Sequence, residues 1–167
     1  MVWTDLTWSA ERESSRSPYF SSVTIDRSGA WWTGTEASDL VDYLKEFTAA
    51  GYPAERVLQI SCSGCGSDKF RVRLDDDEGC AVRTCTGCDT TSFVFDSEDF
   101  VEDADLGDAA CPCGGEVFNV AAGFALHDDG DVRWVDLGLR CVLDGVLGCY
   151  ADWQIDYSPT SHLFEQI

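Results

Sequence analysis

Two short sequences, Cys62-Ser-Gly-Cys65 and Cys85-Thr-Gly-Cys88, decide the fold of the middle of this chain. Each is a Cys-x-x-Cys turn that contains a glycine, and residues 66–84 separate the two turns. This spacing is typical of a tetrahedral Zn²⁺ site with four thiolate ligands. The four cysteine side chains would occupy all four coordination positions of the ion, which is typical of a structural site rather than a catalytic one. We therefore predict a metal site, called site 1, at Cys62, Cys65, Cys85 and Cys88.

Two other interpretations of these cysteines stay open, namely redox-active pairs and plain buried thiols. A redox Cys-x-x-Cys motif belongs in a βαβ context, which the surrounding pattern does not indicate. Iron would fit the same four thiolates, so the sequence favours Zn²⁺ as the cofactor without identifying it. Because metal binding is coupled to folding in small metal-binding domains, zinc would stabilise a short hairpin that has little core of its own.

Residues 111–144 repeat residues 62–88 in a modified form. Cys141-Val-Leu-Asp144 aligns with Cys85-Thr-Gly-Cys88, so that an aspartate stands where a fourth cysteine is expected. Aspartate ligates Zn²⁺ through oxygen, and the set is therefore still complete. The alternative is a degenerate repeat that packs without metal. The predicted ligands of this second site, called site 2, are Cys111, Cys113, Cys141 and Asp144.

Residues 62–88 resemble the zinc-ribbon family, in which two such cysteine turns on a three-stranded antiparallel sheet hold one ion. The resemblance covers about a fifth of the chain, and residues 111–167 look like a second, degenerate unit of the same kind. Zinc ribbons bind nucleic acids, contact proteins or serve as parts of enzymes, so the resemblance implies the fold better than the task. Nucleic-acid-binding ribbons are expected to carry basic strands, whereas this one has the acidic tip Asp75-Asp-Asp-Glu78.

We expect an α+β fold with an N-terminal β-hairpin and one helix, followed by two zinc-ribbon-like antiparallel units. The helix follows Thr35 or Ser38 as its N-cap and ends before Gly51. Its apolar stripe consists of Leu40, Tyr43, Leu44 and Phe47. The predicted segments are a tail at 1–19, a hairpin, helix and strand at 20–60, the first unit at 61–97, an acidic connector at 98–110 and the second unit at 111–167.

Alternation of apolar residues predicts the strands of the second unit. Apolar side chains at every second position of 118–126 would face one side of a strand. The same pattern places Cys149, Ala151, Trp153, Ile155 and Tyr157 on one face of the last strand. We interpret Cys149 and Cys80 as core residues rather than metal ligands.

The composition indicates a folded and strongly acidic protein. Hydrophobic residues make up 44%, which is enough for a core, and 31 acidic against 11 basic residues give a formal net charge of −20. This charge repels phosphate backbones and excludes nucleic acid as the expected partner. It favours a basic protein partner, although an acidic proteome would produce the same composition. The oligomeric state does not follow from the sequence.

The sequence also indicates where in the cell the protein is expected. No apolar run reaches membrane-spanning length, so we expect no membrane partner. The N-terminal residues lack the cationic and apolar regions of a secretory signal. Nine cysteines then indicate metal binding rather than disulfides, and we expect a cytoplasmic protein.

These observations favour a non-enzymatic interaction protein, such as an inhibitor or an immunity-type protein that binds a basic partner. Trp31 and Trp32 are adjacent on a predicted strand and point to opposite faces, so one of them is a candidate interface anchor. The competing classes are an enzyme or enzyme accessory subunit with an open second metal site, and a transcription-associated zinc ribbon. The predicted interaction residues are Trp31, Trp32, Asp75, Asp76, Asp77 and Glu78.

Overall fold

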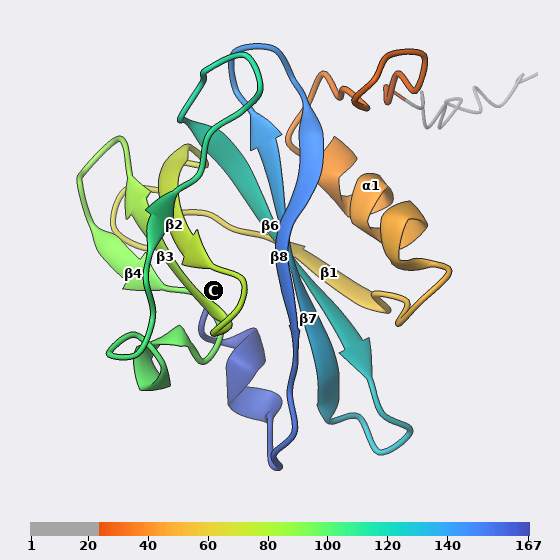
Figure 1. Cartoon of the computed structure of the whole chain (residues 1–167), viewed down its shortest axis with the longest axis vertical. Coiled ribbons are helices and arrows are strands. Elements are labelled where there is room, and N and C mark those ends of the chain that lie inside the picture. Colours follow the sequence, from red (N-terminus) through yellow and green to blue (C-terminus); the bar gives the residue numbers. More distant parts are fainter. Residues whose placement is uncertain (1–23) are drawn as a thin grey trace, which may run out of the picture.

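The computed structural model describes residues 24–167 (Figure 1). The predicted tail and the first strand of the N-terminal hairpin up to residue 23 lie outside these residues. The described part is an α+β structure with one α-helix and an open antiparallel sheet of eight strands. The elements are α1 (Asp39–Thr48), β1 (Arg56–Gln59), β2 (Phe70–Asp75), β3 (Cys80–Cys85), β4 (Thr91–Phe93), the 3-10 turn η1 (Ser97–Asp99), β5 (Gly107–Asp108), β6 (Phe118–Leu126), β7 (Val132–Cys141), β8 (Leu147–Gln154) and the 3-10 turn η2 (Ser161–Phe164).

One sheet connects both predicted units, with the strand order β4-β3-β2-β6-β7-β8. The link is a single antiparallel pair, Phe70 opposite Phe118. Further along β6, the same edge pairs with β1, where Arg56 lies opposite Phe124. The predicted connector at 98–110 contributes β5, which pairs with β2. No helix among the described residues has the length and apolarity needed to cross a membrane.

The helix α1 lies against one face of the sheet (Figure 1). Leu40 and Leu44 of its predicted stripe are fully buried, whereas Phe47 is 53% exposed. Ser38, one of the two predicted residues, is the N-cap of α1, but its side chain makes no capping hydrogen bond. The side chain of Asp39 instead accepts the N–H groups of Thr35 at 2.8 Å and Glu36 at 3.0 Å. Within the described part of the N-terminal hairpin, a single bridge joins Asp26 to Thr33.

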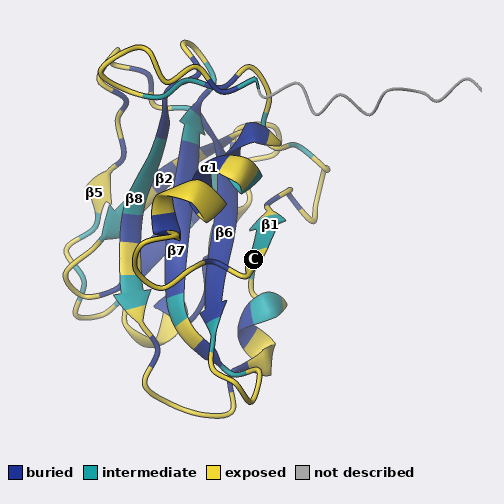
Figure 2. Ribbon diagram, turned by 90° about the vertical axis from the view of Figure 1, so that its right-hand side faces the viewer, coloured by how far each residue is buried: buried dark blue, intermediate teal, exposed yellow. Residues whose placement is uncertain are grey.

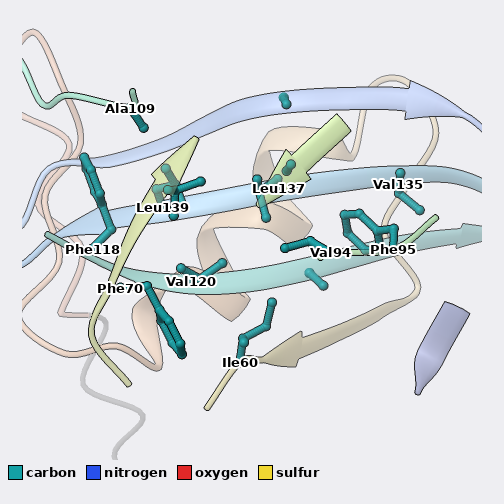
Figure 3. Close-up of a cluster of buried hydrophobic side chains, with 14 of the residues drawn as sticks. Ile60, Phe70, Val94, Phe95, Ala109, Phe118, Val120, Val135, Leu137 and Leu139 are labelled. Atoms are coloured by element: carbon teal, nitrogen blue, oxygen red, sulfur yellow. The ribbon is translucent and has the colours of Figure 1, made fainter. Parts of the chain in front are cut away.

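The main hydrophobic core lies on the other face and is shared by both hairpins. Figure 3 shows Phe70 and Phe118 in it together with Phe95, and the ring of Phe95 meets Phe124 edge to face at 5.4 Å. As Figure 2 shows, β6 and β7 are buried along most of their length, since the core covers one face and α1 part of the other. The alternation predicted for 118–126 is confirmed, because Val120 joins the core while its neighbour Ala121 faces α1.

The predicted alternation of the last strand is wrong at Cys149. Gly138 pairs with Cys149 and Leu137 pairs with Ala151, so Tyr150 is an extra residue in a β-bulge. The extra residue reverses the alternation, and Cys149 points to the α1 side while Ala151 joins the main core. Cys149 is therefore half-buried beside α1 and does not share a face with Ala151.

Candidate metal centres

Site 1 is built by two turns that follow the same local design. The N–H of Gly66 donates to the carbonyl of Cys62 at 2.8 Å, and the N–H of Asp89 donates to the carbonyl of Cys85 at 2.9 Å. Both turn residues have positive φ, 76° at Gly66 and 60° at Asp89. Asp tolerates this conformation better than most residues other than glycine. Each turn thereby brings its two cysteine side chains to the same side of the backbone.

The four sulfurs of site 1 converge on one point. Sγ of Cys62 lies 3.5 Å from Sγ of Cys88, and Sγ of Cys65 lies 3.5 Å from Sγ of Cys85. All four ligand atoms lie within 4.8 Å of one another. A tetrahedral ion with metal–sulfur bonds of about 2.3 Å requires sulfur–sulfur separations of about 3.8 Å. The donor set and its spacing therefore fit a tetrahedral thiolate-bound metal ion such as Zn²⁺.

Site 2 has the same layout with three sulfurs and one carboxylate. Sγ of Cys113 lies 3.7 Å from Sγ of Cys141, and Sγ of Cys111 lies 3.4 Å from the nearer oxygen of Asp144. Gly115 allows this approach, because a Cβ there would lie 2.8 Å from Sγ of Cys141. All four ligand atoms again lie within 4.8 Å of one another. This set also fits a tetrahedral metal ion, with oxygen at the fourth position.

The second turn of site 2 repeats the backbone of site 1, and its first turn is one residue shorter. The N–H of Gly114 donates to the carbonyl of Cys111, and the N–H of Gly145 donates to the carbonyl of Cys141, at 2.8 and 2.9 Å. The two hairpins also share their register. Phe70 begins one strand and lies opposite Cys85 at the end of the next, and Phe118 lies opposite Cys141 in the same way. The match supports the alignment that put Asp144 at the position of Cys88.

Each site contains a thiol that must lose a proton to bind a metal ion. At site 1 the N–H of Ser67 favours the thiolate of Cys65, but hydrogen bonds with Cys85 and the other thiols outweigh it and raise the pKa of Cys65 to about 12. Hydrogen bonds from the hydroxyl and N–H of Thr90 lower the pKa of the Cys88 thiol to about 6. Burial raises the pKa of the Cys111 thiol to about 12. Metal ions bind the thiolate form, so binding must release a proton from Cys65 at site 1 and from Cys111 at site 2.

The remaining buried thiol, Cys80, lies outside both sites. It is fully buried, and its Sγ donates to the carbonyl of Ser97 at 3.5 Å. This agrees with its interpretation as a core residue.

No protein-family model, no curated protein and no solved structure matches this chain significantly. The two ligand clusters are compatible with zinc-ribbon-like units on the geometry alone.

The predicted interaction residues differ in exposure and in their contacts. Trp31 is 59% exposed, whereas Trp32 is half-buried and meets the ring of Tyr43 edge to face at 5.8 Å. At the acidic tip, Asp75 accepts the N–H groups of Asp77, Glu78 and Asp105, and Asp76 accepts the N–H of Asp152. Two of the four tip carboxylates therefore hold the loop in place and the other two, Asp77 and Glu78, face solvent.

A third cluster, Asp136 with Cys149 and Asp152, did not emerge from the sequence. Ligand atoms of these three residues lie within 4.8 Å of one another on the α1 side of β7 and β8. The bulge at Tyr150 brings Cys149 and Asp152 to the same face. The only signal for this cluster in the sequence is Asp136, an acidic residue within a long apolar strand. Alternation of apolar residues does not show that Asp136 lies opposite Asp152.

Proposed function

We propose that this protein is a non-enzymatic interaction module whose fold is stabilised by two Zn²⁺ ions and whose acidic surface binds a basic protein partner. An inhibitor and an immunity-type protein that blocks a basic toxin both belong to this class. The proposal includes a cytoplasmic location, where reduced thiols are available as metal ligands.

The observation that carries the proposal is the closed ligand set of both clusters. Four protein donors surround each position, so a bound ion has no open coordination position for a reacting water. The enzyme alternative needs an open second site, but Asp144 supplies the fourth donor there, 3.4 Å from Sγ of Cys111. This arrangement supports a structural role for both proposed ions.

The charge distribution supports a basic partner. Within residues 24–167 only two ion pairs form, Arg27 with Glu46 and Arg73 with Asp108. Most acidic side chains in the described part of the chain therefore form no ion pair there that would reduce their field. High charge of one sign accelerates encounter with a partner of opposite charge, most strongly at low salt.

Metal analysis of the purified, unreduced protein tests the structural part. We expect about two equivalents of zinc, one for each closed ligand set, and about one in each of the variants Cys85→Ser and Asp144→Ala. Cys80→Ala is the matched control, because it removes a buried thiol that is not a ligand and should keep both ions. Less than one equivalent in the unaltered protein, with a melting temperature that a chelator does not change, would refute the proposal.

A retention experiment tests the interaction part. The immobilised protein is exposed to host extract at low and at moderate salt, and retained proteins are identified. We expect a basic protein that is released as the salt concentration rises, since screening weakens attraction between exposed charges. Retention that does not change with salt, or retention of nucleic acid in place of protein, would contradict a basic protein partner.

A further inference from the structure

A cavity of about 210 Å³ opens between the C-terminal end of α1 and strands β7 and β8. Its walls include three aromatic side chains, Phe47, Tyr52 and Trp134, and two carboxylates, Asp136 and Asp152. None of these residues belongs to site 1 or site 2. The cavity thus combines aromatic and anionic walls in a place that the metal centres do not explain.

Asp136 is the unusual member of this cavity. It is only 4% exposed, and its Oδ2 has no hydrogen-bond partner within residues 24–167. A buried carboxylate oxygen without a donor is unfavourable, so the site lacks a group that would donate to it. Burial and the neighbouring carboxylate of Asp152 raise the pKa of Asp136 to about 7. A cation placed between the two carboxylates would relieve both effects.

The aromatic walls favour an organic cation. The rings of Tyr52 and Trp134 are stacked at 5.2 Å, and the indole N–H of Trp134 donates to Oδ1 of Asp152 at 3.0 Å. This hydrogen bond orients the carboxylate at the edge of the cavity. Aromatic faces attract ammonium and guanidinium groups, and adjacent carboxylates strengthen that attraction by charge-assisted hydrogen bonds. Arg133 stacks on Tyr52 at 4.2 Å and does not line the cavity.

A metal ion is the competing occupant, because Cys149 lies beside both carboxylates. The thiol of Cys149, however, donates to the carbonyl of Ala151 at 3.5 Å, and burial raises its pKa further above neutral. Cys149 also does not line the cavity, so a metal ion held there would have Asp136 and Asp152 as its only charged ligands from residues 24–167. Two carboxylates and three aromatic side chains then remain, and these suit an organic cation better than a transition metal.

We propose that this cavity binds the ammonium or guanidinium group of one lysine or arginine side chain of the basic protein partner. The inference rests on the proposed function, since it names the part of the surface that recognises that partner. The exposed ring of Phe47 would cover the alkyl part of the side chain, and Asp136 and Asp152 would accept hydrogen bonds from its charged end. The acidic surface then supplies attraction at a distance, and the cavity supplies a defined contact.

Titration of the zinc-loaded, ¹⁵N-labelled protein with N-acetyl-lysine N-methylamide tests the cavity directly. The readout is the indole N–H resonance of Trp134, assigned with the Trp134→Phe variant. We expect saturable shifts with the lysine compound and with its arginine analogue, and none with the neutral norleucine analogue. Equal shifts with norleucine, or saturation by Mn²⁺ with no response to the lysine compound, would overturn the proposal.

Variants identify the carboxylates. Asp136→Asn should weaken binding of the lysine compound about tenfold or more, because it removes a charge-assisted hydrogen bond. Asp152→Asn should weaken it as well, and this exposed position does not put folding at risk. Asp103→Asn is the control, since it makes the same change of charge in an exposed turn away from the cavity and should alter binding less than about twofold. Equal affinity in the Asp103 and Asp136 variants would refute the assignment.

The retention experiment separates this inference from the proposed function. A lysine compound that binds through Asp136, together with an extract that yields no basic protein, would leave the cavity assigned and the interaction function refuted. A basic protein retained equally by the unaltered protein and by Asp136→Asn would leave the function standing and refute the role of the cavity in it.

Discussion

Replacing Asp136 by Asn should make the protein more stable, and increasingly so as the pH rises. The folded protein raises the pKa of Asp136 from 3.8 to about 7 through burial and the nearby Asp152. Below about pH 3.8 the side chain is protonated in both the folded and the unfolded state, so the raised pKa has no destabilising effect. As the pH rises, the unfolded chain releases this proton first, and the folded state loses stability until the pH passes about 7. The whole effect corresponds to about 4 kcal/mol as an upper value, at about 1.4 kcal/mol for each pKa unit.

Chemical denaturation at several pH values measures this effect. Between about pH 5 and about pH 8 the stability advantage of Asp136→Asn over the unaltered protein should grow by about 2 kcal/mol. Hydrogen bonds that the Asn amide lacks would lower the advantage equally at every pH, so the growth with pH is the diagnostic quantity. Asp103→Asn should show no such growth. An advantage that is independent of pH would show that Asp136 ionises freely in the folded protein, and the argument from its burial would fail.

Three further changes test other parts of the structure. Gly145→Ala should destabilise the protein by about 3 kcal/mol or more in denaturation, because φ is +78° and a Cβ would lie 2.4 Å from the carbonyl oxygen of Gly34. Gly130→Ala, with φ +91° and no atom within 4 Å, should cost only about 1 kcal/mol, and equal losses would contradict the predicted collision. Phe118→Ala should cost about 3–5 kcal/mol in the same assay, since this fully buried ring belongs to the core that both hairpins share. Asp144→Cys should keep two equivalents of zinc and retain the second ion at higher chelator concentration, and loss of that ion would refute the role of Asp144 as a ligand.

The ligand clusters could be predicted from the sequence because the cysteine turns are local. Two ligands of each turn are close in sequence, and a hairpin between the turns brings them together whatever the rest of the chain does. The repeat also carried the prediction to Asp144, since its turn matches that of Cys88 residue by residue. The helix was predictable for the same reason, because the spacing of Leu40 and Leu44 depends on local geometry alone.

The parts that were missed depend on contacts between distant segments. The bulge at Tyr150 places the side chain of Cys149 on the α1 side of the sheet. The periodicity of apolar residues contains no signal for a single inserted residue. The cavity needs Asp136 and Asp152 opposite each other, which that register decides. The joining of both hairpins into one sheet at Phe70 and Phe118 likewise follows from packing around a common core.

The pairing of β1 with β6 has a consequence for synthesis of the chain on the ribosome. The ligands of the first cysteine site all lie within residues 62–88, so they leave the exit tunnel well before residues 121–124 do. Strand β1 precedes this site but finds its neighbour only when residues 121–124 have been translated. A nascent chain stalled between these points would present the four cysteines together with a strand that has no partner, exposed to chaperones and to other chains.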